Sequence, residues 1–564
     1  MAKKPKLSEA QKAQARLSRN QKKLVRGVFT KAGFSSVAQV RDAEFKFKHV
    51  TSDFDDCFVY ENVIVLVEYT IASDDKVGEH LKNKQGVYNV IDQSRAEFIP
   101  FLKGKFPDLA AALPPEYLDH HLRVVILYCA LNSVKAQHRE LVPQVSFFDF
   151  HVIKYFETVS KATALSSRFE LLDFLGLTYS DVGDAVLRAT SQIALDTFNC
   201  SVLPEGHSNF GKGFKVVSFY ASPAAILPRA CVLRRYGWRE GERAYQRLIS
   251  VKKIQQIRRY LRASRRVFIN NIVATLPEGA KIIDDKGDTV DPATILTTSP
   301  AKLQLPLIHN SVGLIDGQHR VYSYHEGGEH DQDFRIMRAQ QNLLVTGIIF
   351  PPGMAEDVKL QFEAKLFLEI NSNQATAKSD IKQEIASIIE PFSGDAICRR
   401  VMTKLNNSNG PLQDKFQRYG YERDAMKTSS VVSFALKPLV GPRGALWERA
   451  EQKLTEGIAA SDVSYLEEYV TYCTTQINAI FSGVRQNVSS GNWTASRKIS
   501  GHFLTTRNVN AILACLRKLA REDKLRTVDE YRMAFKEIED FDSKNFGSSK
   551  YNAMGEALYK KFFT

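Results

Sequence analysis

The sequence has no apolar run long enough to cross a bilayer, which takes about 18 uninterrupted residues. Its most apolar stretches, Val63–Ile71 and Leu122–Leu131, are much shorter and are typical of buried strands. The N-terminal stretch MAKKPKLSEAQKAQARLSRNQKK is basic but has no apolar core, so we do not expect it to be a secretory signal. These absences disfavour membrane-spanning and secreted proteins and predict a cytoplasmic location.

Other absences narrow the chemistry. The seven cysteines lie far apart in the chain of 564 residues and form no CxxC pair. Zinc sites and a disulfide framework are therefore not expected, and a reducing compartment fits. The sequence also lacks a glycine-rich loop followed by Lys-Ser or Lys-Thr, which excludes P-loop chemistry.

Positive charge, by contrast, is in excess, with a net charge of +14 and a pI near 9.2. Such an excess favours a polyanionic partner such as DNA, because cationic side chains release the counterions of nucleic acid. Many cytosolic proteins are mildly basic, however, so the distribution of charge matters more than its total. The segment KKIQQIRRYLRASRR concentrates cations in one helix-length stretch. The candidate nucleic-acid-binding residues are Lys252, Lys253, Arg258, Arg259 and Arg262.

Changes of pattern along the chain predict an α/β multidomain protein. Alternating strand and helix patterns fill two regions, a segment rich in Gly, Asn, Ser and Pro separates them, and helical periodicity dominates after Pro391. The expected organisation is a basic tail (1–19), a first α/β domain (20–190), a linker (191–213), a second α/β domain (214–390) and a helical C-terminal domain (391–564).

Carboxylates cluster in SDFDDCFVYENVIVLVEYT, around a predicted hairpin that turns at Glu61-Asn62. Glu68 lies within the apolar second strand, and an ionised glutamate there needs a partner because its desolvation is costly. If Asp56 on the neighbouring strand faces the same way, the two carboxylates converge. Such a pair suits Mg²⁺, and the candidate metal ligands are Asp55, Asp56 and Glu68.

This arrangement resembles the PD-(D/E)XK nuclease fold over about residues 20–175. In that fold an acid on one strand and Glu-x-Lys on the next hold metal and water. Asp56 (or Asp55) matches the first acid and Glu68 matches the second, but Thr70 stands at the lysine position.

The departure at Thr70 leaves two interpretations. In some relatives the lysine moves to the following helix, where this sequence has Lys82 and Lys84 in EHLKNK. The resemblance then implies that Thr70 positions the water and that Lys84 or Lys82 supplies positive charge to the developing phosphorane. The implied catalytic residues are Asp56, Glu68, Thr70 and Lys84. Alternatively, the aspartates are solvated turn residues and Glu68 pairs with Lys84 for structural reasons.

A second polar cluster follows the apolar run LPLIHNSVGLI. Gly317 permits a tight turn from strand to helix, and Asp316 can cap that helix or hold a cation. The free N–H groups of the helix, beside His319 and Arg320, would form a site for phosphate. The alternative is a capped helix in which an Arg–Asp pair closes the turn.

The hexamer IDGQHR (Ile315–Arg320) resembles the signature of DGQHR-domain proteins. These include the DndB-like regulators of DNA phosphorothioate modification and are more distantly similar to the ParB-like fold. The segments AYQRLISVKKIQQIRRYL, VFINNIVATLP and LFLEINSNQATAKSD resemble further blocks of that family, over about residues 223–390. The resemblance implies a site for nucleotide or nucleic-acid phosphate, with candidate residues Asp316, Gly317, Gln318, His319, Arg320, Asn371, Asn373 and Gln374.

The excess of positive charge favours DNA as a partner, and the resemblance to DGQHR-domain proteins implies a DNA-binding protein of a prokaryotic DNA-modification or phage-defence system. The leading hypothesis is a Mg²⁺-dependent DNA endonuclease domain coupled to a DGQHR domain that senses nucleotide or DNA. One alternative is a non-catalytic, DndB-like DNA-binding transcriptional regulator, which Thr70 favours; another is a nucleoside-triphosphatase switch at His319 and Arg320. The expected cofactors are Mg²⁺ and a nucleoside triphosphate. Besides DNA, a second copy of the chain or other defence proteins are the expected partners.

Overall fold

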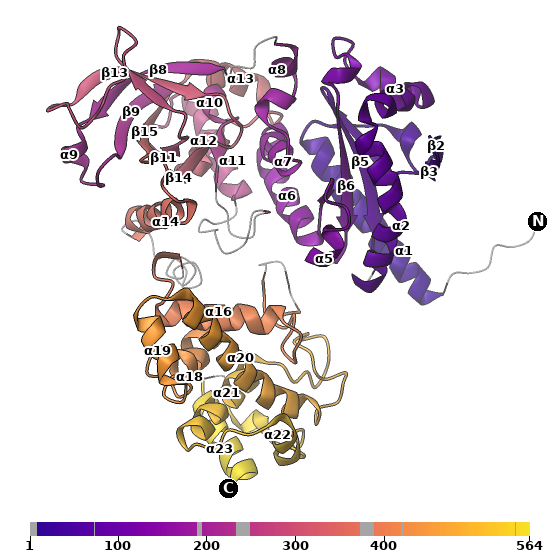
Figure 1. Ribbon diagram of the computed structural model, residues 1–564, viewed down its shortest axis with the longest axis vertical. Helices are drawn as coiled ribbons and strands as arrows, with labels where there is room; N and C mark the ends of the chain where they lie inside the picture. The colour runs from indigo at the N-terminus through magenta and orange to yellow at the C-terminus, as the bar shows by residue number, and fades with distance from the viewer. Residues whose placement is uncertain are drawn as a thin grey trace, which may run out of the picture. The chain divides into compact units, whose positions relative to one another are not determined.

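The computed structural model describes residues 8–72, 74–132, 134–188, 194–232, 238, 249–372, 388–418, 422, 424–547 and 549–564. The chain divides into two compact units, one made of residues 1–241 and 246–355 and the other of residues 242–245 and 356–564. The first unit contains two large β-sheets with their helices, and the second is mainly helical (Figure 1). The prediction of an α/β multidomain protein with a helical C-terminal region is confirmed.

The first sheet has five strands in the order β1-β4-β5-β6-β7. Strands β4 and β5 form an antiparallel hairpin, and β6 and β7 continue the sheet in parallel with β5. The central strands are almost continuously apolar because helices cover both faces of the sheet (Figure 1). The strand bounds are Ser35–Ser36 (β1), Asp56–Tyr60 (β4), Val63–Thr70 (β5), Arg123–Ala130 (β6) and Val145–Phe147 (β7).

The two faces of this sheet have separate cores. One core joins Val63, Val65 and Val67 to α1, α6 and α7. The other joins Ile64 and Leu66 to α2, α3 and α4. Alternate residues of β5 therefore point to α1 and to α2, as the pleat of a strand requires. The helices are Glu9–Lys31 (α1), Asp74–Gln93 (α2), Arg95–Lys105 (α3), Pro107–Ala112 (α4), Ala136–Arg139 (α5), Phe150–Thr163 (α6), Arg168–Phe174 (α7) and Asp184–Leu187 (α8), beside the small hairpin of β2 (Phe45–Phe47) and β3 (Val50–Ser52).

The second sheet has eight strands in the order β10-β14-β11-β15-β9-β8-β13-β12. The range 191–213, which composition predicts to be a linker, contains β8, and β8 pairs with β9 and β13 within this sheet. The strands are Leu195–Leu203 (β8), Lys215–Ala221 (β9), Ala230–Cys231 (β10), Ile272–Leu276 (β11), Lys281–Ile283 (β12), Ser299–Pro306 (β13), Val312–Asp316 (β14) and Leu343–Ile349 (β15). The helices are Glu205–Ser208 (α9), Pro223–Ile226 (α10), Val251–Ser264 (α11), Gln318–Tyr322 (α12) and Asp331–Gln340 (α13).

The turn after α6 joins the two sheet regions of the first unit. The backbone N–H of Leu165 donates to the carbonyl of Glu326 at 3.1 Å, and the N–H of Glu326 donates to the Ser166 hydroxyl at 2.9 Å. The guanidinium of Arg168 pairs with the carboxylate of Glu326 at 2.6 Å. Glu326 follows α12. The loop that comes after Asp316–Arg320, where the sequence predicts phosphate binding, is therefore attached to the first sheet region.

The second unit is built from amphipathic helices around one apolar core. Leu466, Ile477 and Phe481 of α20 are fully buried, as are Leu513 and Leu516 of α21 to within 1%. Among the described residues, no helix is both long enough and apolar enough to span a membrane. The helices are Glu356–Ser372 (α14), Gly394–Asn407 (α16), Thr428–Val431 (α17), Lys437–Val440 (α18), Gln452–Ala459 (α19), Val463–Arg485 (α20), Thr506–Arg521 (α21), Val528–Ala534 (α22) and Tyr551–Phe563 (α23).

Candidate functional site

Asp56 is fully buried at the start of β4 and is surrounded by donors. Arg26 donates to both of its oxygens, at 2.8 and 3.1 Å, and Arg41 donates to Oδ1 at 2.8 Å. The hydroxyl of Tyr69 donates to Oδ2 at 2.9 Å. A buried carboxylate with both oxygens engaged in this way fixes the structure around it. Asp56 therefore has the environment of a structural charge.

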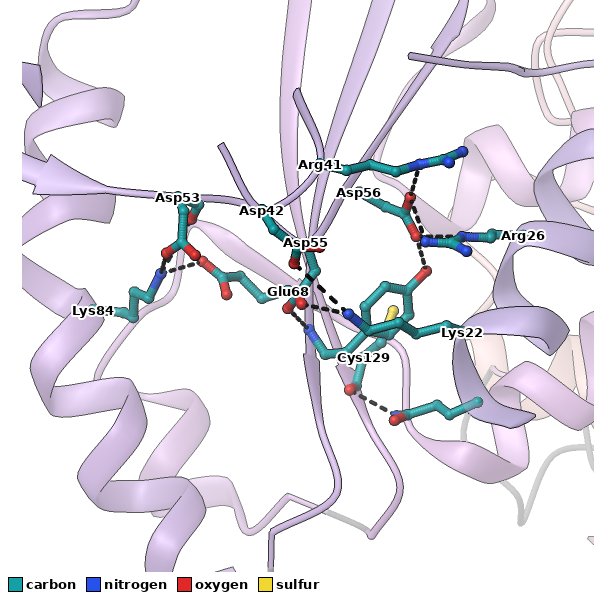
Figure 2. Close-up of polar contacts among 12 residues, drawn as sticks. Lys22, Arg26, Arg41, Asp42, Asp53, Asp55, Asp56, Glu68, Lys84 and Cys129 are labelled. Carbon is teal, nitrogen blue, oxygen red and sulfur yellow. Dashed lines mark hydrogen bonds and ion pairs between the residues drawn. The ribbon is translucent and has the colours of Figure 1, made fainter. Parts of the chain in front are cut away.

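The prediction that Asp56 converges with Glu68 is wrong. The hairpin register pairs Asp56 with Val67, so the pleat turns Glu68 to the opposite face of the sheet. Figure 2 shows Asp56 pointing to Arg26 and Arg41, away from the ion pair of Glu68.

Asp55 immediately precedes β4, and its negative charge acts on Glu68. Its backbone N–H donates at 2.9 Å to the carbonyl of Val67, the residue that the register pairs with Asp56. Its Oδ1 lies 2.7 Å from Nζ of Lys22, and its Oδ2 accepts from the backbone N–H of Tyr69 at 2.8 Å. Of the two acids proposed for the first motif position, Asp55 is the one whose charge acts on Glu68.

Glu68 and Lys84 form an ion pair on the α2 face. Glu68 is only 4% exposed, and its Oε1 lies 2.7 Å from Nζ of Lys84. The same Nζ lies 3.2 Å from Oδ1 of Asp53 and donates to the Ser52 hydroxyl at 3.0 Å. Lys84 thus reaches from α2 to the end of β5, whereas Lys82 is exposed on that helix.

Burial changes the acid–base properties of this pair. It raises the pKa of Glu68 to about 7; Lys84 opposes the rise, and the negative charges of Asp55 and Asp53 add to it. Burial also lowers the pKa of Lys84, but the carboxylates of Glu68 and Asp53 outweigh that effect and leave the pKa raised. Lys84 is therefore a persistent cation, while Glu68 changes its charge near neutral pH.

Two residues that the sequence analysis did not select lie beside this pair. Tyr128 of β6 is paired with Glu68 in the parallel register, and its hydroxyl is 2.9 Å from Nδ1 of His80. The Tyr128 hydroxyl also interacts with the side chain of Thr70. Burial and the charge of Lys84 lower the pKa of His80, so its imidazole is neutral at pH 7. The signal that selects Tyr128 is its position in the strand next to Glu68, which becomes visible only with the parallel pairing of β5 and β6.

The donor chemistry here fits Mg²⁺ in kind, because Asp53, Asp55 and Glu68 offer carboxylate oxygens. Asp53 and Glu68 face the same small space, since both accept from the Lys84 ammonium. Within the described parts of the chain, however, no group of three or more His, Cys, Asp and Glu side chains has the geometry to hold a metal ion. As folded, the cluster is held by ion pairs to Lys84 and Lys22.

The turn at Gly317 forms as predicted. Gly317 has φ +100° and precedes α12, and a Cβ at this position would lie 2.5 Å from Cδ1 of Ile272. A side chain is therefore excluded both by the left-handed backbone and by the close packing.

The polar residues around Gly317 are engaged by the protein itself. Arg320 pairs with Asp316 and donates to the carbonyl of Asn271 at 2.7 Å. Nε2 of His319 accepts the backbone N–H of Ser250 at 3.1 Å, and Gln318 is buried. This is the arrangement of the alternative in which an Arg–Asp pair closes the turn. The side chain of Asn371 and the residues Asn373 and Gln374 lie outside the described part of the chain.

The basic residues of α11 separate into two sets. Lys252 and Lys253 are exposed in the first turn of the helix. Arg258 is buried, and its guanidinium donates to the carbonyls of Ser323 and Glu329. Arg259 and Arg262 are exposed on the side of α11 that also carries Arg258, and all three line one cavity.

Comparison with models of protein families finds none that matches this chain. Comparisons with curated proteins and with solved structures find no match either.

Proposed function

We propose that the five-stranded region is a PD-(D/E)XK-like, Mg²⁺-dependent DNA endonuclease domain. The observation that carries this proposal is the contact of Lys84 with Glu68 at the end of β5, where the charge of Asp55 also acts on Glu68. Lys84 brings from α2 the positive charge that Thr70 does not supply in the Glu-x-Lys position. The order of helix, antiparallel hairpin, helix and parallel strand supports the same assignment.

In this proposal Asp55 and Glu68 hold Mg²⁺, with Asp53 at its edge. The ion would lower the pKa of a bound water and stabilise the charge that develops on the phosphate. Lys84 adds a fixed cation beside the scissile phosphate, since its ammonium already lies at this strand end. Thr70 and the Tyr128 hydroxyl would orient the water by hydrogen bonds. Asp56 holds the hairpin in place through Arg26 and Arg41 and takes no part in the chemistry.

The remainder of the chain supports a DNA partner through its charge. The net charge of +14 and the cationic helix α11 would draw DNA to the first unit. The resemblance of IDGQHR to DGQHR-domain proteins supports a role in DNA modification or phage defence. The proposed nuclease would then act within such a system.

The test is cleavage of supercoiled plasmid by the full-length protein with Mg²⁺ or Mn²⁺. Glu68→Gln and Lys84→Gln are each expected to lower the cleavage rate by about 100-fold or more, the scale seen when an electrostatic catalytic group is removed. The matched control is Glu97→Gln, because Glu97 is exposed and its carboxylate forms an ion pair with Lys48 at 2.9 Å. Its cleavage should equal that of the wild type. Plasmid left intact by the wild type, or cut equally by Glu68→Gln, would refute the proposal.

The second candidate function is a DNA-binding regulator without catalysis. Thr70 in the lysine position favours it, as does the ion pair that already neutralises Glu68. This candidate predicts DNA binding that weakens as salt rises, with no cleavage by the wild type. The nucleoside-triphosphatase alternative has less support, because Arg320 and His319 are engaged by Asp316 and by the backbone of Ser250.

A further inference from the structure

A cavity of about 540 Å³ lies beside α11 in the first unit. Helix α11 contributes Arg258, Arg259 and Arg262, the end of α6 contributes Lys161, and the segment 325–334 contributes Glu329 and Phe334. Known ligand pockets have volumes of roughly 300–1,000 Å³. The cavity is therefore large enough for a ligand of mononucleotide size.

The charge of the lining is strongly positive. Four cationic side chains line the cavity, and Glu329 is the one carboxylate among the lining residues. Lys161 and Arg262 pair with Glu157 and Asp333 at 2.6 and 3.2 Å.

Arg258 and Arg259 lack such partners. In the described part of the chain, no carboxylate lies within ion-pair distance of either guanidinium. Arg258 is 7% exposed and binds the carbonyls of Ser323 and Glu329, with its guanidinium 3.6 Å from the centroid of Phe334. Burial lowers the pKa of Arg258 to about 10, so it remains charged at pH 7. The charges of Asp331 and Glu329 act on Arg258 without forming an ion pair with it, and an anionic ligand in the cavity would stabilise this buried cation further.

The lining also has an apolar side. Ala164 and Val251 are partly exposed in the lining, whereas Ile254 and Phe334 are each only 1% exposed and belong to the core of the second sheet. Arginine is suited to phosphate because its planar fork can donate two parallel hydrogen bonds. An apolar wall beside an arginine cluster is the pattern expected for a ligand with a charged phosphate and a less polar body.

We propose that this cavity binds a phosphate-bearing ligand of mononucleotide size. Arg259 and Arg262 contact the phosphate, Arg258 adds buried positive charge, and the body of the ligand packs against Ala164 and Val251. The source of the phosphate is either a free nucleotide or the phosphorylated 5′ end of a DNA strand. The proposed site therefore lies beside α11, whereas the sequence predicts phosphate binding at the Asp316–Arg320 turn. The proposal does not depend on nuclease activity.

The test is isothermal titration of the full-length protein with AMP, adenosine, inorganic phosphate and a short single strand with or without a 5′ phosphate. AMP or the phosphorylated strand should bind, and adenosine and the unphosphorylated strand should bind at least about tenfold more weakly. The probe that binds best identifies the source. Binding of inorganic phosphate as tight as that of both larger probes would refute a ligand of nucleotide size, and failure of every phosphate-bearing probe would refute the site.

Two double variants on one helix provide the matched comparison. Arg259→Gln with Arg262→Gln should lower the preference for the phosphorylated over the unphosphorylated probe by about tenfold or more, whereas Lys252→Gln with Lys253→Gln should leave that preference unchanged. Both variants remove two charges from α11, but only the first pair lines the cavity. An equal loss of that preference in both would indicate general electrostatic attraction and would overturn the proposal. Glu68→Gln should retain binding, which separates this outcome from failure of the nuclease proposal. Circular dichroism melts verify that each variant is folded.

Discussion

The ends of β5 and β14 both carry clustered ionisable groups, and the two clusters differ in their charge balance. At β14, Arg320 meets the single carboxylate of Asp316 and a backbone carbonyl. At β5, Lys84 is shared between Glu68 and Asp53, while Asp55 lies close enough to influence the pKa of Glu68. A one-to-one pair closes a turn, but an excess of carboxylates favours an additional cation.

A further carboxylate, Asp56, extends this comparison. It lies one residue from Asp55 in the chain, yet two arginines and a tyrosine bind it. The identity of an acid therefore does not decide its role, whereas the number of donors around it does. Three predictions test this difference.

The largest effect is expected at Asp56. Asp56→Asn should lower the free energy of unfolding of the first unit by about 3–5 kcal/mol, because it leaves two arginines without their buried anion. Urea denaturation of the full chain, followed by circular dichroism, measures the change. Asp53→Asn is the control, since Asp53 has a side chain that is 54% exposed and should change stability by about 0.5 kcal/mol or less. Equal effects of the two variants would contradict a structural role for Asp56.

The second prediction concerns the pH dependence of the free energy of unfolding that Glu68 causes. Its pKa in the folded protein is about 7, above the ordinary value of 4.5, so the folded state holds its proton more tightly than the unfolded state does. The stability contributed by that proton is full below pH 4.5 and is lost as the pH rises through 7. The wild type should thus lose up to about 3 kcal/mol relative to Glu68→Gln between pH 5 and pH 8.

Urea titrations of both proteins across this range measure the difference. Other titrating groups, such as Asp149, are present in both proteins and cancel. A difference that stays constant from pH 5 to pH 8 would mean that Glu68 is ionised throughout. Plasmid cleavage should rise over the same range, because metal binding requires the ionised carboxylate.

The smallest change in the free energy of unfolding is expected at the turn that the Asp316–Arg320 pair closes. A double-mutant cycle with Asp316→Asn and Arg320→Gln should give a coupling energy of about 1 kcal/mol, as for other partly exposed pairs. The free energies of unfolding of the four proteins provide this value. No loss of AMP binding is expected in either single variant. If Asp316→Asn or Arg320→Gln abolishes AMP binding while the Arg259→Gln, Arg262→Gln variant retains it, the nucleotide site lies at the Asp316–Arg320 turn and not beside α11.

The sequence predicts much of the fold because its patterns are local. The apolar strand Val63–Thr70, the following helix and the glycine turn at Gly317 all form as expected. The sequence also allows the hairpin register to be inferred, because a two-residue turn at Glu61-Asn62 places Tyr60 opposite Val63 and therefore Asp56 opposite Val67. That inference would have excluded Asp56 from the site.

Other features depend on contacts between distant segments and leave little local signal. Strand β8 lies in a stretch whose polar composition resembles a loop, and its pairing with β13 defines it as a strand. Arg26 and Arg41 reach Asp56 from α1 and from the loop after β1. The division of α11 into lining arginines and exposed lysines likewise depends on how α6 and the segment 325–334 pack against it.

The attachment of Glu326 has a practical consequence for how this chain can be divided. Leu165, Ser166 and Arg168 hold Glu326 by its carbonyl, its N–H and its carboxylate. A fragment that ends near residue 190 would leave those three groups without their acceptor or donor. A fragment that begins after that point would lose the wall that α6 gives to the cavity beside α11. A replacement of one sheet region should therefore retain these three contacts with Glu326.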